Sequence, residues 1–151
     1  MSGQIRLERM YLKDASFESP ATPQIFRETW KPEVQVDINT RSERFEDTYF
    51  EVVVSATITA TVKKTAFIAE VHYAGLFMIE GVEGEDLRRA LGTICPNTLF
   101  PYIRESVDSL VVKGGFPALH LAPINFDALY AEAMRKQKEQ GPDVTDRKSV
   151  V

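Results

Sequence analysis

The sequence predicts an α+β fold, in which a four-stranded antiparallel sheet carries helices on one of its faces. Two observations lead to this prediction. Apolar and polar residues alternate from residue 49 to residue 79 with one interruption, as they do in a long β-hairpin. After residue 95, two apolar stripes recur at helical spacing, each behind a helix-start signal. The 151 residues suffice for one core, so we expect a single domain over residues 1–138.

Two short strands are predicted before the hairpin. Residues 5–12 are rich in long apolar side chains, although these do not alternate cleanly with polar ones. Residues 34–38 alternate apolar and polar side chains, as a half-buried strand does. Residues 41–47 are charged and are expected to form a turn.

The connection over residues 13–32 is long for a compact domain, and such connections tend to be functional when they are ordered. Three prolines interrupt it, and Thr22-Pro23 predicts one short turn of helix over residues 24–29. Large aromatic side chains on a loop must either enter the core or line a cleft. Those on this connection are Phe17, Phe26 and Trp30.

The hairpin can be placed in register from its pattern alone. Both strands place alternate apolar residues on one face, and a slip of one residue would turn one of these faces away. With the turn centred on Lys63-Lys64, Ile58 opposes Ala69 and Phe50 opposes Phe77. The reverse face mixes serines, threonines and acids with a few apolar residues. It is expected to be exposed, either simply solvated or receiving a partner.

Three helices are predicted after the sheet. Residues 83–92 form a short one, and the next is expected to start at Asn97 as its N-cap and to end at Gly114-Gly115. The last starts at Asn125, again an N-cap. Residues 139–151 are polar and are predicted to form a disordered tail.

Both long helices carry an apolar stripe. The stripe of the first is expected to pack in the core, and it comprises Phe100, Ile103, Val107, Leu110 and Val111. The stripe of the second is richer in aromatic and methionine side chains, which suit changing partners, so a surface groove and plain core packing both remain open for it. This second stripe comprises Phe126, Leu129, Tyr130, Ala133 and Met134.

Composition restricts the class of protein. A net charge of −4 argues against nucleic acid or an anionic membrane as the main partner. A single cysteine cannot form an internal disulfide, which fits a reducing compartment. No apolar run is long enough to span a bilayer, and the N-terminus lacks the apolar core of a signal peptide. We therefore expect a cytoplasmic protein.

Little in the sequence points to catalysis. Cys95, His72 and His120 could in principle supply a nucleophile and a base, but no motif orders them. Their spacing does not fit a zinc site, and no phosphate-binding glycine loop follows a strand. We therefore expect a protein that is not an enzyme and binds no cofactor, with Cys95 as a packed thiol.

Several unusual stretches of the chain, in one order, resemble the SecB family of bacterial protein-export chaperones. They are Tyr11-Leu-Lys-Asp-Ala-Ser-Phe-Glu-Ser-Pro, Trp30-Lys-Pro-Glu-Val, Cys95-Pro-Asn-Thr-Leu-Phe-Pro-Tyr, Gly114-Gly-Phe-Pro and Leu121-Ala-Pro-Ile-Asn-Phe-Asp-Ala-Leu. The resemblance covers residues 5–137. It implies an ATP-independent chaperone that binds unfolded preproteins, keeps them translocation-competent and delivers them to the export ATPase SecA. It also implies assembly as a dimer of dimers.

Two surfaces follow from this resemblance together with the residue pattern. A groove for unfolded polypeptide is expected where apolar residues stand in segments flanked by polar ones: Phe26, Trp30, Val34, Val36, Ile38, Phe126, Leu129 and Tyr130. Family members contact SecA through an acidic sheet surface, and the matching positions here are Asp14, Glu18, Ile68 and Glu70. The stretch Ile68-Ala-Glu-Val departs modestly from the usual Leu-Cys-Glu-Val of the family but keeps the apolar–acid pair.

Two other interpretations remain. A SecB-like chaperone dedicated to one client, such as an antitoxin, would have the same fold and groove. A small-molecule binder or thioesterase-like enzyme on a helix-backed sheet would need a closed pocket with convergent polar groups, and no acid–base set for it is present in the sequence.

Overall fold

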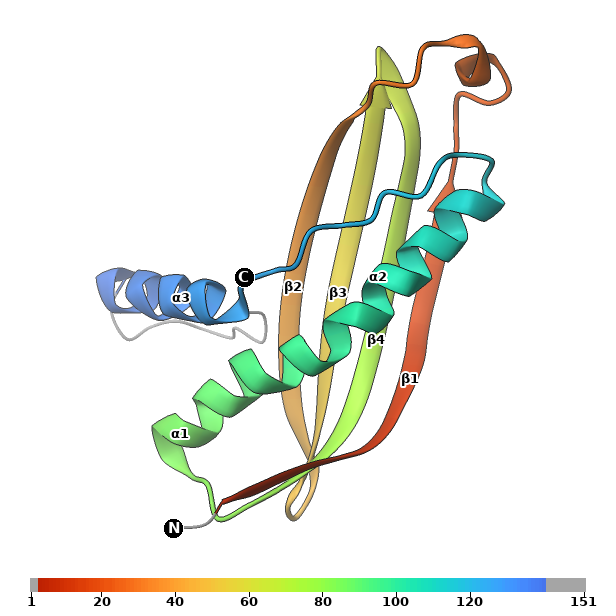
Figure 1. Ribbon diagram of the computed structural model, residues 1–151. Helices are drawn as coiled ribbons and strands as arrows, with labels where there is room; N and C mark the ends of the chain where they lie inside the picture. The colour runs from red at the N-terminus through yellow and green to blue at the C-terminus, as the bar shows by residue number, and fades with distance from the viewer. Residues whose placement is uncertain (1–2, 141–151) are drawn as a thin grey trace.

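The computed structural model describes residues 3–140, which form an antiparallel four-stranded sheet with a long helix packed across one face (Figure 1). The predicted α+β fold is confirmed. The strands lie in the order β1-β4-β3-β2, so β1 and β2 form the two edges. Their bounds are β1 Gln4–Glu18, β2 Glu33–Glu46, β3 Tyr49–Val62 and β4 Lys64–Glu80.

The predicted register of the central hairpin is confirmed. Ile58 opposes Ala69 and Phe50 opposes Phe77. The turn itself is tighter than expected, because Val62 already pairs with Lys64 and only Lys63 lies between them, in the left-handed conformation at φ 64°. A register shift between Ala60 and Thr61 absorbs the difference, so the apolar faces still coincide.

Strand β1 is longer than predicted and continues to Glu18. Its pairing with β4 shifts once between Leu7 and Arg9 and again between Leu12 and Asp14. Each bulge adds one residue and reverses which side chains face the core. This is why the sequence of this strand does not alternate cleanly.

Strand β2 also extends further than predicted, to Glu46, and the expectation of a turn over residues 41–47 is wrong. The reversal is confined to Asp47, which has a positive φ of 48°, and its neighbour. The charged residues belong to an edge strand, where charge discourages pairing with another chain.

The helices after the sheet form one nearly continuous rod (Figure 1), so the predicted start at Asn97 is wrong. Helix α1 (Gly84–Arg89) runs through a π-helical segment η2 (Ala90–Ile94) into α2 (Cys95–Lys113). Pro96 and Pro101 lack the N–H that an α-helix donates to the residue four positions earlier. The widened turn of η2 lies just before them.

The predicted C-terminal end of this rod and the predicted start of the last helix are both confirmed. Helix α2 ends at Lys113 with Gly114 as its C-cap, and Gly115 takes the left-handed conformation at φ 93°. The N–H groups of Gly115 and Phe116 then donate to the carbonyls of Val112 and Val111, at 3.0 and 3.1 Å, which is a Schellman motif. Helix α3 (Phe126–Gln140) starts where Asn125 Oδ1 accepts the N–H of Ala128 at 2.9 Å. Most of the predicted tail lies outside the described residues.

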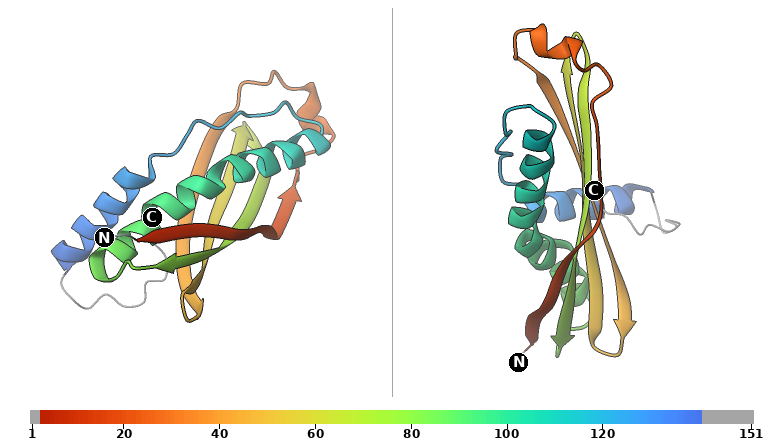
Figure 2. Two further views of the ribbon diagram at one scale, coloured as in Figure 1. Left: turned by 60° about the horizontal axis from the view of Figure 1, so that its bottom comes forward. Right: turned by 90° about the vertical axis from the view of Figure 1, so that its right-hand side faces the viewer.

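The core lies between α2 and the sheet. It contains the predicted stripe of α2, of which Ile103, Val107 and Val111 are fully buried. Residues 117–125, which we call the strap, leave the end of α2 and cross the sheet on the same face before α3 begins (Figures 1 and 2). The reverse face of the sheet has no helix over it within the described residues.

Candidate functional surfaces

Five aromatic side chains gather at the end of the sheet near the C-terminus of α2. This aromatic cluster consists of Phe17, Phe26, Trp30, Phe67 and Phe116. Phe116 lies at its centre, with ring centroids 5.1 Å from Phe67, 5.2 Å from Trp30 and 5.1 Å from Phe26. Phe67 and Phe116 are buried, whereas Phe26, in the 3₁₀ turn η1 (Gln24–Arg27), is 49% exposed. The cluster therefore extends from the core to the surface.

Two glycines allow these rings to approach the backbone. A Cβ atom on Gly114 would lie 2.3 Å from the ring of Phe17, and one on Gly115 would lie 3.1 Å from the ring of Phe26. Gly115 must in addition take the left-handed conformation. The helix stop and the packing of the cluster therefore need the same two residues.

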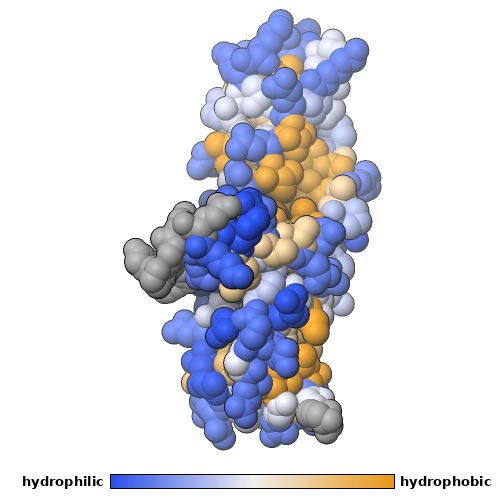
Figure 3. Space-filling model, turned by 90° about the vertical axis from the view of Figure 1, so that its left-hand side faces the viewer, coloured by the Kyte–Doolittle hydropathy of each residue, from blue (hydrophilic) through white to orange (hydrophobic). Residues whose placement is uncertain are grey.

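An apolar strip continues from the cluster to the β2 edge. This edge strip consists of Val34 and Val36, which are 40% and 37% exposed. Val34 opposes Ala60 on β3, and Ala60 opposes Phe67 of the cluster on β4, so the row crosses the sheet without a break. Figure 3 shows a hydrophobic area bounded by hydrophilic residues on this side of the molecule. Such a surface suits an extended polypeptide with scattered apolar side chains.

The predicted groove residues on α3 lie elsewhere. Phe126 and Tyr130 are only 3% and 5% exposed, and Leu129 is half-buried against the core. The ring of Phe126 packs 6.0 Å from that of Phe100, near the start of α2. The structure thus places Phe26 and Trp30 in the aromatic cluster with the edge strip beside them, near the C-terminus of α2, and leaves the α3 residues near its start. Ile38 is itself buried, with 7% exposure.

Tyr130 has a structural partner in this second location. Its hydroxyl donates to a carboxylate oxygen of Glu85 on α1 at 2.7 Å, and the guanidinium of Arg89 lies 5.3 Å from its ring centroid. Burial and this hydrogen bond both raise the pKa of the Tyr130 hydroxyl. These contacts fasten α3 to α1.

On the opposite face of the sheet, the four predicted acidic-surface residues do come together. Glu18 on β1 opposes Ile68 on β4, and one pleat further along Ser16 opposes Glu70. Asp14 and Glu18 are exposed, and the side chain of Glu70 is 42% exposed. We call Asp14, Glu18, Ile68 and Glu70 the acidic surface.

Glu70 is held by a short polar chain. His72 Nε2 lies 2.7 Å from Glu70 Oε2, and His72 Nδ1 lies 2.6 Å from Ser55 Oγ on β3. Because a carboxylate only accepts hydrogen bonds, Nε2 of His72 carries the hydrogen, and in the neutral ring Ser55 donates to Nδ1. The carboxylate of Glu70 is therefore fixed in position on the sheet.

Comparison with known proteins decides the family. The family model described as preprotein translocase subunit SecB matches residues 1–137. The chain belongs to the SecB family.

Relatives named Protein-export protein SecB are similar over most of their length. The protein of Hahella chejuensis is 54% identical over 89% of this chain and 85% of its own length. That of Marinobacter nauticus is 51% identical over 91% and 84%. A solved SecB-like chaperone of Mycobacterium tuberculosis, in complex with an antitoxin peptide, has a TM-score of 0.67 over 80% of this chain and 91% of that one, at 18% identity, and so shows the shared fold.

The sequence patterns did not identify two members of the aromatic cluster of this SecB-family chain. Phe67 occupies a core-facing position in the alternation of β4, like many other residues, and Phe116 directly follows the glycine pair after α2. Their shared position depends on how α2 crosses the sheet, which no local pattern encodes. The available signal was the Gly114-Gly115 pair, because two successive glycines beside an aromatic residue indicate close packing.

The candidate catalytic residues are not assembled. Cys95, the first residue of α2, is fully buried, and burial raises the pKa of its thiol to about 12. His72 lies on the opposite face of the sheet and His120 lies on the strap. Among the described residues, no three histidine, cysteine or acidic side chains are grouped to hold a metal.

Proposed function

We propose that the chain is an ATP-independent cytosolic chaperone that binds unfolded preproteins, keeps them translocation-competent and delivers them to SecA. Membership of the SecB family over residues 1–137 carries the proposal, since relatives at about 50% identity are protein-export proteins. No helix within residues 3–140 combines the length and apolar character needed to cross a membrane.

The aromatic cluster and the edge strip supply the binding surface. Phe26, Val34 and Val36 keep between 37% and 49% of their surface exposed, which is unusual for apolar side chains that adjoin a core. An extended client can lay alternate side chains against them without matching a fixed sequence. Each contact is weak, so a long client gains affinity by reaching several copies of this surface at once. Binding the unfolded client in this way shifts the folding equilibrium of the client toward its unfolded state by mass action, and this needs no nucleotide.

The acidic surface supplies the contact with SecA. Glu18 and Glu70 flank the apolar side chain of Ile68 on an open sheet face, and Asp14 lies further along β1, opposite His72. This arrangement suits a partner segment with basic residues beside an apolar anchor. Because Asp14 and Glu18 are exposed, this contact is expected to weaken as salt increases.

Assembly as a dimer of dimers is part of the proposal. Leu12 on the edge strand β1 is 50% exposed, and on α2 Tyr102 and Val112 are 44% and 56% exposed. One self-contact along β1 and a second along α2 would cover these side chains. Four chains of 17.0 kDa make a particle of about 68 kDa.

Dedication to a single antitoxin client is less favoured. The structural relative bound to an antitoxin peptide is 18% identical to this chain, whereas the protein-export relatives reach 54%. A small-molecule site is less favoured too, because the apolar surface is open rather than enclosed.

The proposal is tested by suppression of aggregation. The protein is mixed with a chemically unfolded preprotein, without nucleotide, while light scattering is recorded. We expect full suppression at a ratio close to one assembly per client and no further gain on adding ATP. Continued aggregation at stoichiometric excess would contradict the proposal.

A further inference from the structure

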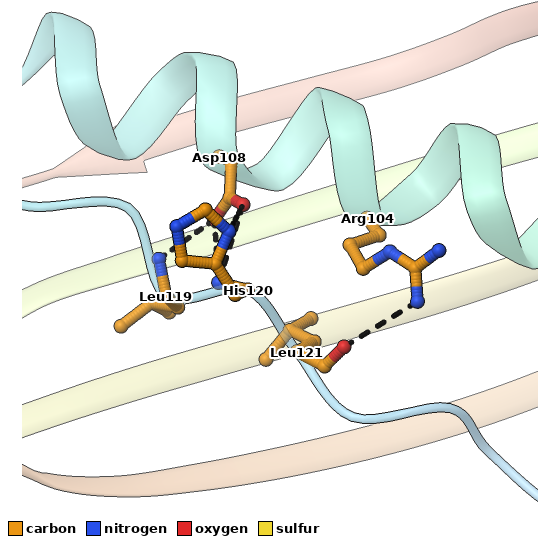
Figure 4. Close-up of polar contacts among 5 residues, drawn as sticks. All are labelled: Arg104, Asp108, Leu119, His120 and Leu121. Carbon is orange, nitrogen blue, oxygen red and sulfur yellow. Dashed lines mark hydrogen bonds and ion pairs between the residues drawn. The ribbon is translucent and has the colours of Figure 1, made fainter.

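The strap is fastened to α2 by one carboxylate. Figure 4 shows Asp108, on the fourth turn of α2, pointing at the backbone of the strap. The N–H of Leu119 donates to its Oδ1 at 2.9 Å, and the N–H of His120 donates to its Oδ2 at 3.2 Å. In addition, the imidazole Nδ1 of His120 lies 3.7 Å from the same Oδ2. Hydrogen bonds to a charged acceptor are stronger than those between neutral groups.

The backbone of the strap is bent to make these bonds. His120 has a φ of 53°, in the left-handed region that residues with a side chain rarely adopt. The N–H groups of two successive residues also reach the same carboxylate, whereas successive N–H groups of an extended chain point in opposite directions. The side chain of Asp108 is only 19% exposed, so water competes little for it.

A second side chain of α2 holds the next strap residue. Arg104, one turn before Asp108, points its guanidinium at the carbonyl of Leu121, with Nη1 3.5 Å from the oxygen (Figure 4). Leu119 and Leu121 pack against the core beneath. Three consecutive strap residues are thus held from the helix while two of them cover the sheet.

The fastened segment leads directly from the aromatic cluster. Phe116, the centre of the cluster, lies three residues before Leu119, and the Schellman motif fixes its other side through its own N–H. The segment between is therefore clamped at both ends. Releasing the Asp108 end would free Phe116 to leave the exposed ring of Phe26 and the partly buried ring of Trp30, which both pack on it.

We propose that Asp108 is a positioning residue for client binding: by clamping the strap it holds Phe116, and with it the aromatic cluster, in the arrangement that receives an unfolded polypeptide. This inference rests on the proposed chaperone function. The benefit is preorganisation, because a cluster that is already ordered loses less entropy when a client binds.

The test compares three variants of the full-length protein. Asp108→Leu removes both acceptor oxygens but enlarges the side chain, and Asp108→Asn keeps one acceptor oxygen with almost no change of volume. Glu105→Gln is the matched control. Glu105 is an exposed acid that lines a shallow cavity together with Asp108 and His120, and among the described residues it makes no hydrogen bond to the strap. Two quantities are measured: hydrogen exchange at the amides of residues 119 and 120, and the affinity for a reduced and alkylated, permanently unfolded polypeptide.

We expect exchange at both amides to accelerate about tenfold or more in Asp108→Leu, less in Asp108→Asn and not at all in Glu105→Gln. Client affinity should fall in the same order, by about fivefold in Asp108→Leu. If Asp108→Leu does not fold, the difference between Asp108→Asn and Glu105→Gln decides.

Unchanged exchange in the Asp108 variants would overturn the clamp. Faster exchange with unchanged client affinity would overturn its role in binding. Failure of the wild-type protein to bind any unfolded polypeptide would contradict the proposed function instead, and the exchange rates would still report on the clamp.

Discussion

His72 donates a hydrogen bond from Nε2 to the carboxylate of Glu70, at 2.7 Å, in the middle of the acidic surface. This contact sets the direction of an acid that is otherwise on an open sheet. It also links β4 to β3, because the other ring nitrogen of His72 meets Ser55. The surface proposed to meet SecA is therefore ordered before a partner arrives.

Reversing the charge of Glu70 should weaken the contact with SecA. In Glu70→Lys the new ammonium group repels a basic partner and replaces the acceptor for His72. We expect binding to SecA, measured by calorimetry at low salt, to weaken about tenfold or more. Glu46→Lys makes the same charge change at the far, exposed end of β2 and should bind normally. Equal affinity of both variants for SecA would remove the acidic surface from the proposal.

Removing the exposed apolar side chains should weaken client capture without unfolding the protein. We predict that Phe26→Ser, Val34→Ser and Val36→Ser, combined, lower affinity for an unfolded polypeptide about tenfold, since each loses part of an apolar contact. Fluorescence anisotropy of a labelled client measures this. Phe45→Ser is the control, because Phe45 is 63% exposed near the other end of β2. A similar loss in the control would show that the effect is not local.

Adding a methyl group at Gly114 should destabilise the protein. The new Cβ would lie 2.3 Å from the ring of Phe17, so Gly114→Ala must displace that ring and should cost about 1–3 kcal/mol of unfolding free energy. Denaturant unfolding measures the change. Replacing the ring by the smaller side chain of leucine, in Phe17→Leu, should reduce the loss of unfolding free energy that Gly114→Ala causes. If the two changes are simply additive, the ring is not the obstacle.

The thiol of Cys95 should be inert in the folded protein. Its pKa, raised to about 12 by burial, leaves almost no thiolate at pH 8, and the side chain is inaccessible. We expect a thiol reagent to modify Cys95 only as fast as the protein unfolds. Rapid modification under native conditions would contradict this packing.

Glu51 should make stability depend on pH. Burial alone would raise the pKa of its carboxyl group, but hydrogen bonds from Lys13 and Tyr11, at 2.8 and 2.7 Å, lower it overall. A lowered pKa in the folded state stabilises the protein above the ordinary value of 4.5, and this contribution is lost as the pH falls through the folded value. The stability difference between wild type and Glu51→Gln should therefore be present at pH 7 and vanish at pH values below the lowered pKa of the folded state. A stability difference that persists at such low pH would mean that it arises from packing and not from the charge of Glu51.

The sequence predicted what depends on local periodicity. Alternation placed Phe50 opposite Phe77, and side-chain capping placed the start of α3 at Asn125, because both follow from neighbours along the chain. The bulges of β1 and the extension of β2 to Glu46 were missed, since a bulge reverses the alternation and an edge strand tolerates charge. The start of α2 was missed because the π-helical turn carries the helix past Pro96.

The residues of the candidate surfaces likewise include some that the sequence could predict and some that it could not. Ile68 and Glu70 share a face by alternation, so their place on the acidic surface could be predicted. Trp30 and Phe116 meet only because α2 crosses the sheet at a particular angle, and residue spacing does not record that angle. For the same reason, the α3 stripe could not be assigned between groove and core, and Phe126 and Tyr130 proved to be buried.

Site-specific photo-crosslinking tests the central claim most directly. A photoreactive amino acid is placed at Val36 in the edge strip or, in a second protein, at Phe45 near the other end of the same strand. Each protein is mixed with a labelled unfolded preprotein and irradiated without nucleotide. The account predicts strong crosslinking from position 36, lost on competition with an unlabelled client, and little from position 45. Equal crosslinking from both positions, or none from position 36, would contradict it.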